Sequence, residues 1–273
     1  MRPGRDNIAA PDLPHDLEWV GAAPESMPAL TAGGPALVHF LDFAQLNSAR
    51  TLPYLEEWSK RYAEAGLSVI GVQAPRFPFG AEREAVAAGL ERLEVSFPVA
   101  IDSTRALWTA YGCEGWPSLF LWSLGGALAW FHFGEGEYRG TEEAIQDELR
   151  EIDALRPLPE PLAPLRETDA PGAEVMPPSP EIFPSDSWEH PWVAGAEADE
   201  LAVEYAAGGA WLTAEGDGEV ALELDGAAVE SIRVNGAGLY PLASHRRHET
   251  HTLLLRPAAG LRVWSISFEA GLP

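Results

Sequence analysis

The stretch that most constrains the fold is an apolar strand that runs directly into an amphipathic helix. Residues 36–40, Ala-Leu-Val-His-Phe, are typical of a buried strand. Beyond them, apolar residues recur with the period of a helix: Leu52, Leu55, Trp58 and Tyr62. Such a turn places free N–H groups and the positive end of the helix dipole together. Redox proteins put Cys-x-x-Cys at this position because the helix end stabilises a thiolate, whereas this chain has Gln45-Leu46-Asn47-Ser48.

Several segments can be compared with a known fold. They are Arg50–Trp58 with Pro53 inside it, the apolar run Leu67–Val72, the segment Tyr111–Leu121 with Trp116-Pro117, and Phe131–Gly136. Together they resemble the thioredoxin-like fold, in particular the redoxin branch related to the extracytoplasmic domain of DipZ-type cytochrome-biogenesis fusions. The resemblance covers the region from residue 8 to residue 152. It implies that Pro53 is the kink of the first helix and that Pro117 is the cis-proline of the family.

The departures from this family fall at its reactive centre. Gln45 and Ser48 stand where the two cysteines would be, and Leu41 stands where a tryptophan precedes them. His39 stands where thioredoxins keep a buried acid that handles protons. Because disulfide exchange needs a thiolate that attacks a disulfide, we expect exchange to be lost and Gln45 and Ser48 to be vestigial redox positions.

The chain is long enough for two domains. We predict an α/β thioredoxin-like domain at 1–155, with helices over 81–93, 104–111 and 141–155 and strands over 97–102, 118–123 and 127–133. A linker is predicted at 156–186, because residues 157–191 hold ten of the 24 prolines. Prolines fix φ and remove hydrogen-bond donors, which favours a semi-rigid extended tether. Within it, Ser179–Phe183 is predicted to dock on a domain.

Residues 187–273 are predicted to form an all-β sandwich domain of jelly-roll type. Short strands are expected over 201–206, 210–214, 219–224, 229–234, 238–242, 250–256 and 262–268. The expected turns between them contain Gly208-Gly209, Gly216-Asp217-Gly218 and Asp225-Gly226. Leu239-Tyr240 with His251-Thr252-Leu253 resembles the carbohydrate-binding-like module that follows the redoxin domain in DipZ-type proteins. This resemblance implies a possible glycan partner.

Each candidate site in the redoxin-like half has two interpretations. Cys113 is either a redox thiol or a small packed residue without a helix end to acidify it. His39 is either a core histidine hydrogen-bonded to a neighbour or a proton-handling group beneath the turn at 45–48. Ser48, at a predicted helix start, is interpreted as a helix cap more readily than as a nucleophile.

The predicted sandwich domain offers two further candidates. His245 and His251 lie on the opposite face of a regular strand from His248, so three of these ligands are not expected to converge and no metal site is predicted. Four tryptophans could stack on sugar rings or could be ordinary core residues: Trp188, Trp192, Trp211 and Trp264.

Charge and cysteine content limit the function. A net charge of −24, from 42 acidic and 18 basic residues, repels nucleic acid and anionic lipid, so neither is an expected partner. A single cysteine excludes a disulfide within the chain. No cofactor is implied. The N-terminus lacks the pattern of a signal peptide and no run is long enough to span a bilayer, so we expect a cytoplasmic protein.

We therefore expect a thioredoxin-like binding or scaffold module, with enzymatic activity uncertain and its absence favoured. A protein or peptide would bind in the former substrate groove, formed by the following residues: Phe43, Ala44, Gln45, Asn47, Ser48, Trp116 and Pro117. A backbone edge there can pair with an extended peptide without sulfur. The alternatives are a redoxin-type oxidoreductase or peroxidase that uses Cys113 or an intermolecular partner thiol, and a glycan-binding protein that acts through the C-terminal domain.

Overall fold

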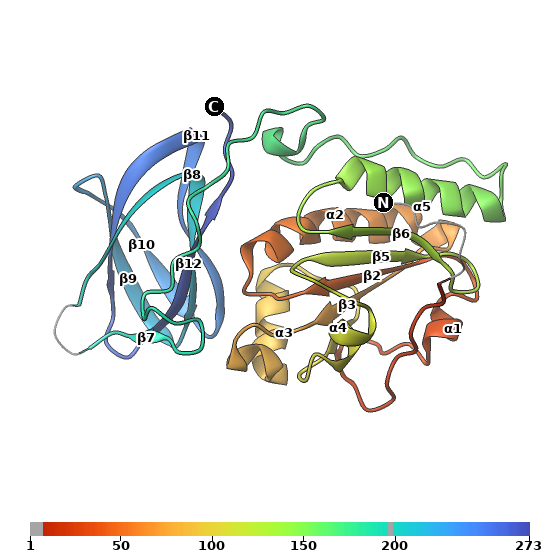
Figure 1. Cartoon of the computed structure of the whole chain (residues 1–273), viewed down its shortest axis with the longest axis horizontal. Helices are drawn as coiled ribbons and strands as arrows, with labels where there is room; N and C mark the ends of the chain where they lie inside the picture. The colour runs from red at the N-terminus through yellow and green to blue at the C-terminus, as the bar shows by residue number, and fades with distance from the viewer. Residues whose placement is uncertain (1–7, 196–198) are drawn as a thin grey trace. The chain divides into compact units, whose positions relative to one another are not determined.

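A computed structural model describes residues 8–195 and 199–273 of the chain. The chain divides into two compact units, Met1–Leu165 and Arg166–Pro273 (Figure 1). Among the helices in the described ranges, none is long and apolar enough to cross a membrane.

The first unit is a mixed sheet with helices on both faces. Its strands are β1 (Glu18–Val20), β2 (Ala36–Leu41), β3 (Ser68–Gln73), β4 (Val99–Ile101), β5 (Ser118–Trp122) and β6 (Leu128–Phe133). They lie in the order β1-β4-β3-β2-β5-β6, with β2, β3 and β4 parallel to one another and β1, β5 and β6 antiparallel to their neighbours. The α-helices are α1 (Met27–Leu30), α2 (Leu46–Tyr62), α3 (Arg83–Arg92), α4 (Ala106–Ala110) and α5 (Tyr138–Ile152). Short 3₁₀ turns occur at Ala63–Ala65 and Pro78–Ala81.

Strand β2 forms the centre of this unit. All six of its residues are buried, because helices cover both faces of the sheet. Val38 and Phe40 point to one face, where they share a core with Leu107 of α4. Figure 1 shows α2 and α5 along the other face. The continuous apolar run in the sequence thus corresponds to a strand buried on both sides.

The predicted helices and strands of this half are present, with shifts at their ends. Helix α2 begins at Leu46, and its N-cap is Gln45, not Ser48 as the sequence suggested. Helix α5 begins at Tyr138, three residues before the predicted start, after Glu137 in the left-handed region at φ 51°. The N-termini of α2 and α5 are set by local backbone conformation and capping, which the spacing of apolar residues does not predict.

The first part of the proline-rich segment is bound to the helices of the first unit. The carbonyl of Pro159 accepts a hydrogen bond from Gln146 Nε2 at 2.9 Å. The N–H of Leu162 donates to Glu142 Oε2 at 2.9 Å, and the N–H of Leu165 donates to the Tyr54 hydroxyl at 2.8 Å. This stretch is therefore not a free tether, because side chains of α2 and α5 satisfy its backbone groups.

A later part of the same segment is bound within the second unit, after a 3₁₀ turn at Glu167–Asp169. The N–H of Met176 donates to the carbonyl of Gly271 at 2.8 Å. Ser179 exchanges hydrogen bonds with Ala206, and Ile182 forms an isolated bridge with Ile266. The predicted docking of Ser179–Phe183 on a domain is confirmed by these bonds.

The second unit is all-β and antiparallel, consistent with a β-sandwich. Its strands are β7 (Trp192–Val193), β8 (Leu201–Glu215), β9 (Asp217–Leu224), β10 (Ala227–Asn235), β11 (Gly238–Pro257) and β12 (Arg262–Glu269). Their order is β10-β9-β11-β8-β12-β7. Buried side chains from β8 to β12 meet in a single core, which requires the sheet to curl over itself. The predicted turn at Asp225-Gly226 is present between β9 and β10, whereas the turn predicted at Gly216-Asp217-Gly218 is confined to Gly216, because β9 begins at Asp217.

Two of the predicted strand boundaries are wrong. Gly208-Gly209 is not a turn, because β8 continues through it from Leu201 to Glu215. A Cβ on Gly208 would lie 2.7 Å from the carbonyl oxygen of Ala270, and one on Gly209 would lie 2.9 Å from that of Ala243. These glycines permit a close approach of neighbouring backbones. Likewise, the two strands predicted over 238–242 and 250–256 are the ends of the single strand β11.

Candidate functional site

The candidate site of the first unit lies at one edge of its sheet. Phe40, near the end of β2, pairs with Ser118 at the start of β5. The turn that follows β2 and the loop that precedes β5 therefore lie at the same edge of the sheet. The Trp116–Pro117 peptide in that loop is cis.

The two positions that would hold redox cysteines are occupied by side chains with structural bonds. Gln45 Oε1 accepts a hydrogen bond from the N–H of Ser48 at 2.7 Å, which caps α2. Ser48 is fully buried, and its Oγ accepts from the N–H of Asp42 at 3.3 Å. One of the free N–H groups that would favour a thiolate is thus already satisfied.

Asp42 is a buried acid that the sequence reasoning did not single out. Its Oδ1 accepts from the N–H of Ala44 at 2.9 Å, and its Oδ2 accepts from the N–H of Arg76 at 2.6 Å. Burial raises the pKa of Asp42, although these bonds act in the opposite direction. Gln73 accepts from the N–H of Phe43 at 3.0 Å beside it. The signal in the sequence was an acid directly after an apolar strand.

His39 lies in the middle of β2 and is fully buried. Neither ring nitrogen has a hydrogen-bond partner in the part of the chain that the structure describes. Burial lowers the pKa of His39 to about 3, so the ring is neutral at physiological pH. This argues against the proton-handling interpretation. His39 is a core residue, but the hydrogen bond to a neighbour that we expected of a core histidine is not found among the described residues.

Cys113 is half-buried and packs against the core that contains Phe40. Burial raises the pKa of its thiol to about 12, with a hydrogen bond from Ser118 acting in the opposite direction. The thiol is therefore protonated near neutrality and is a poor nucleophile.

The expected groove residues differ in accessibility. Phe43, Ala44, Ser48 and Pro117 are buried, whereas three side chains remain half-buried: Gln45, Asn47 and Trp116. Trp116 is held in place, because its Nε1 donates to the carbonyl of Ala74 at 2.8 Å and its ring centroid lies 4.4 Å from that of Trp108.

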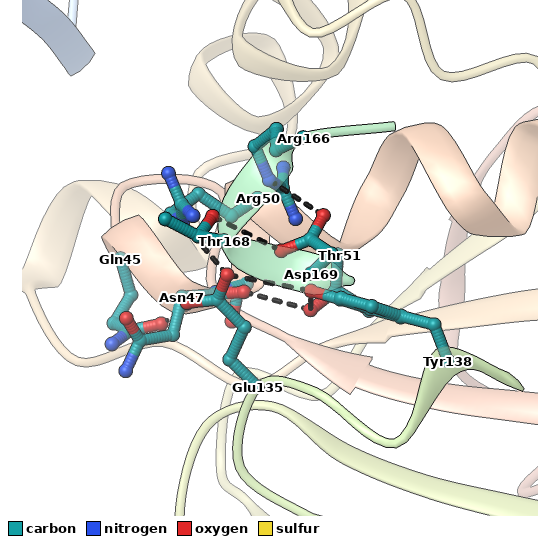
Figure 2. A network of polar contacts seen from close by, with 10 residues as sticks. Gln45, Asn47, Arg50, Thr51, Glu135, Tyr138, Arg166, Thr168 and Asp169 are labelled. Atoms are coloured by element: carbon teal, nitrogen blue, oxygen red, sulfur yellow. Dashed lines mark hydrogen bonds and ion pairs between the residues drawn. The ribbon is translucent and has the colours of Figure 1, made fainter. Parts of the chain in front are cut away.

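A polar network that sequence reasoning missed involves the second turn of α2 (Figure 2). Arg50 Nε donates a hydrogen bond at 2.7 Å to Oε1 of Glu135, which lies in the loop between β6 and α5. The Tyr138 hydroxyl lies 3.4 Å from the same oxygen and 3.5 Å from Thr51 Oγ1. Tyr138 also stacks on Tyr54, with ring centroids 3.7 Å apart. Helix α2 is thereby tied to the start of α5 beside the candidate site.

In the second unit the structure brings two of the predicted histidines together. His245 and His251 stack with ring centroids 3.9 Å apart, and Glu249 lies beside them. The pKa of His245 is lowered mainly by burial and, to a smaller extent, by the neighbouring His251. His248 is not part of this cluster, as expected for a residue on the opposite face of the strand, whereas Glu249, which the sequence reasoning did not consider, supplies a third potential ligand atom.

The tryptophans of the second unit do not share one environment. Trp264 is buried, and Trp192 and Trp211 are half-buried. Trp188 is the most exposed of the four at 54%. A buried Trp264 has no face to offer a sugar ring.

The strand order of the first unit, with its parallel β2, β3 and β4, its antiparallel β5 and β6 and helices on both faces, defines a thioredoxin-like fold. It lacks Cys-x-x-Cys, since Cys113 is the only cysteine. Over 155 residues the chain is similar to Protein DipZ of Mycobacterium bovis and Mycobacterium tuberculosis, with 33% identity. The alignment covers 56% of this chain and 22% of those proteins.

Other comparisons concern about half of the chain. The Arabidopsis thaliana protein SUPPRESSOR OF QUENCHING 1, chloroplastic, is 25% identical over 139 residues, which cover 51% of this chain and 13% of that protein. A thioredoxin-like protein solved in its oxidized form has 21% identity and a TM-score of 0.49, and covers 53% of this chain and 97% of its own. A putative thiol:disulfide interchange protein DsbE from Chlorobium tepidum has 19% identity and a TM-score of 0.46, covering 52% and 96%. No family model matches the chain.

Proposed function

We propose that the thioredoxin-like domain is a binding module that has lost thiol–disulfide exchange and holds an extended protein segment beside Gln45, Asn47 and Trp116. The observation that carries this proposal is the bond from Ser48 N–H to Gln45 Oε1. The side chain at the position of an attacking cysteine is used to cap α2, and no sulfur is present at either redox position.

The protonation of Cys113 supports the loss of redox chemistry. With its pKa raised to about 12, this thiol has little thiolate at neutral pH, and the chain offers no second cysteine to resolve a mixed disulfide. A redoxin-type oxidoreductase or peroxidase acting through Cys113 would need both a thiolate and a partner thiol from another molecule.

The backbone of Trp116 supports peptide binding. Across residues 8–195 and 199–273, neither its N–H nor its C=O has a hydrogen-bond partner, and β5 begins two residues later at Ser118. An extended segment can pair with such a backbone edge through main-chain hydrogen bonds. The anchored indole of Trp116 adds a rigid aromatic surface, and anchored aromatic residues often contribute strongly to binding.

The test uses the full chain and a displayed random-peptide library without cysteine. Selected peptides are titrated onto the ¹⁵N-labelled protein, and shifts are expected at the amides of Trp116 and Asn47. Trp116→Ala should abolish binding, whereas the matched control Trp188→Ala should bind normally. Full binding by Trp116→Ala would place the ligand elsewhere. Separately, insulin-disulfide reduction should not rise above background, and turnover that Cys113→Ser removes would contradict the loss of redox activity.

A further inference from the structure

Strand β11 brings together two histidines that a regular strand would separate. Six residues of extended chain span about 20 Å, yet the ring centroids of His245 and His251 are 3.9 Å apart with planes at 21°. The cause is a change of register against β8. Between the pairs Ser244–Gly209 and Glu249–Ala207, β11 advances by five residues and β8 by two. The extra residues leave the ladder and fold His245 back toward His251.

A carboxylate completes the cluster. One potential ligand atom from each of His245, Glu249 and His251 lies within 4.8 Å of the other two. His251 Nε2 and Glu249 Oε2 are 3.5 Å apart. Two ligands of a tetrahedral zinc ion, with bonds of about 2.0–2.1 Å, lie about 3.3–3.4 Å apart. The spacing of this pair is therefore close to that of two ligands of the same ion.

The orientation of His251 is fixed by a second carboxylate. Asp225 Oδ2 lies 2.7 Å from His251 Nδ1, and Asp225 Oδ1 accepts from the N–H of Thr252 at 2.9 Å. An Nδ1–H that donates to this carboxylate leaves the lone pair on Nε2. That Nε2 is shielded from solvent and makes no hydrogen bond in the described part of the chain. Metal-binding histidines commonly have this carboxylate partner on their other nitrogen.

The aromatic ring of Tyr205 packs beside both histidines of the cluster. Tyr205 pairs with His251 across the strands, and its ring centroid lies 5.8 Å from that of His245 and 6.0 Å from that of His251. The Tyr205 hydroxyl lies 2.7 Å from His245 Nε2. Tyr205 is itself buried and stacked on Phe268 at 4.8 Å. Both imidazoles are therefore held in place before any ligand binds.

We propose that His245, Glu249 and His251 bind a zinc-class divalent transition-metal ion, with Asp225 as the positioning residue for His251. Two imidazoles and one carboxylate are a donor set that zinc accepts, and three protein ligands leave a further position for water. The ion would fix the bulge of β11 from within the second unit. This inference is independent of peptide binding by the thioredoxin-like domain.

The test measures metal binding directly on the full chain after treatment with EDTA and dialysis. Titration with ZnCl₂ by calorimetry should show one saturable equivalent, and Co²⁺ should give visible d–d absorption bands that Zn²⁺ displaces. Asp225→Asn should weaken binding by about 10–100-fold, the usual loss for an outer partner of a ligand. His251→Ala should weaken it further. The matched control His248→Ala, on the same strand but outside the cluster, should bind with the affinity of the unchanged protein.

Circular dichroism in EDTA first establishes that each variant is folded. Glu249 is exposed, so Glu249→Gln removes a ligand with little effect on the fold, and it decides the question if His251→Ala does not fold. The absence of saturable binding to the unchanged protein would overturn the proposal. The proposal would also be overturned if the two single variants Glu249→Gln and Asp225→Asn both bound zinc with undiminished affinity. A loss of zinc binding in His248→Ala equal to the loss in His251→Ala would overturn it too.

Discussion

Restoring two cysteines at the start of α2 tests whether the scaffold still has the geometry for the lost chemistry. The variant combines Gln45→Cys and Ser48→Cys with Cys113→Ser, which removes the competing thiol. Positions 45 and 48 are the N-cap and the third residue of α2, so they are neighbours on one turn. Their Cα atoms should lie within about 4.4–6.8 Å, the span that a disulfide tolerates.

The structure gives the expected energetic changes. Loss of the Gln45 cap should cost about 1 kcal/mol. Loss of the Ser48 acceptor leaves the buried N–H of Asp42 without its bond, at about 1–3 kcal/mol. The reduced variant should therefore be less stable than the parent by about 2–4 kcal/mol. On oxidation, a disulfide that closes a loop of four residues should raise the free energy of unfolding by about 2 kcal/mol.

The two introduced thiols should differ in acidity. The thiol at position 45 is half-exposed at a helix start and should be more acidic than a free cysteine, whereas burial at position 48 should have the opposite effect. Turnover in disulfide reduction should nevertheless be poor, because His39, with a pKa of about 3, does not exchange a proton near neutrality.

The assay counts free thiols before and after mild oxidation and compares urea unfolding of both forms. Two thiols should disappear from a monomer, and the oxidised form should gain about 2 kcal/mol in free energy of unfolding. Gln45→Cys with Cys113→Ser, which retains Ser48, is the control that cannot close a disulfide within the chain. A folded variant that keeps two free monomeric thiols under oxidant would refute the placement of this turn and the alignment of the whole stretch.

Two further predictions concern the core of the thioredoxin-like domain. Because His39 has a pKa of about 3 when folded against 6.5 as a model group, the unfolded chain binds the extra proton between these values and stability falls as the pH is lowered. Between pH 6.5 and 4 this amounts to about 3 kcal/mol, which His39→Leu should remove in urea unfolding; an unchanged pH dependence would contradict the burial of a neutral ring. Gly89→Ala should destabilise by about 1–3 kcal/mol, since its Cβ would lie 2.3 Å from Phe43 Cδ2. Gly33→Ala, with nothing within 4 Å, should change thermal stability little, and equal effects of both substitutions would disprove the clash.

The sequence by itself determined the elements whose signal is local. The apolar run at 36–40 predicted a buried strand, and the recurrence of Leu52, Leu55 and Trp58 predicted the helix that follows. Gly216 and Asp225-Gly226 marked turns, because the left-handed backbone there favours glycine and aspartate. These features follow from the chain's own periodicity and backbone preferences, which act over a few residues.

Only the tertiary structure decided the features that depend on residues far apart in the sequence. The buried carboxylate of Asp42 depends on the turn after β3, because its Oδ2 accepts a hydrogen bond from the N–H of Arg76. The sequence Gly208-Gly209 is the same in a turn and in a strand, and the nearby backbone of Ala270 decides between them. A local sequence pattern cannot predict where a backbone segment that is distant in the sequence will lie.

The histidine cluster shows the same limit most clearly. Counting alternate positions along β11 separates His245 from His251 by about 20 Å. The pairing of β11 with β8 skips residues between Ser244 and Glu249, which cancels that separation and brings a carboxylate beside both rings. Register between strands is set by the packing of the whole sheet, so a site built on a bulge becomes visible only when both strands are in place.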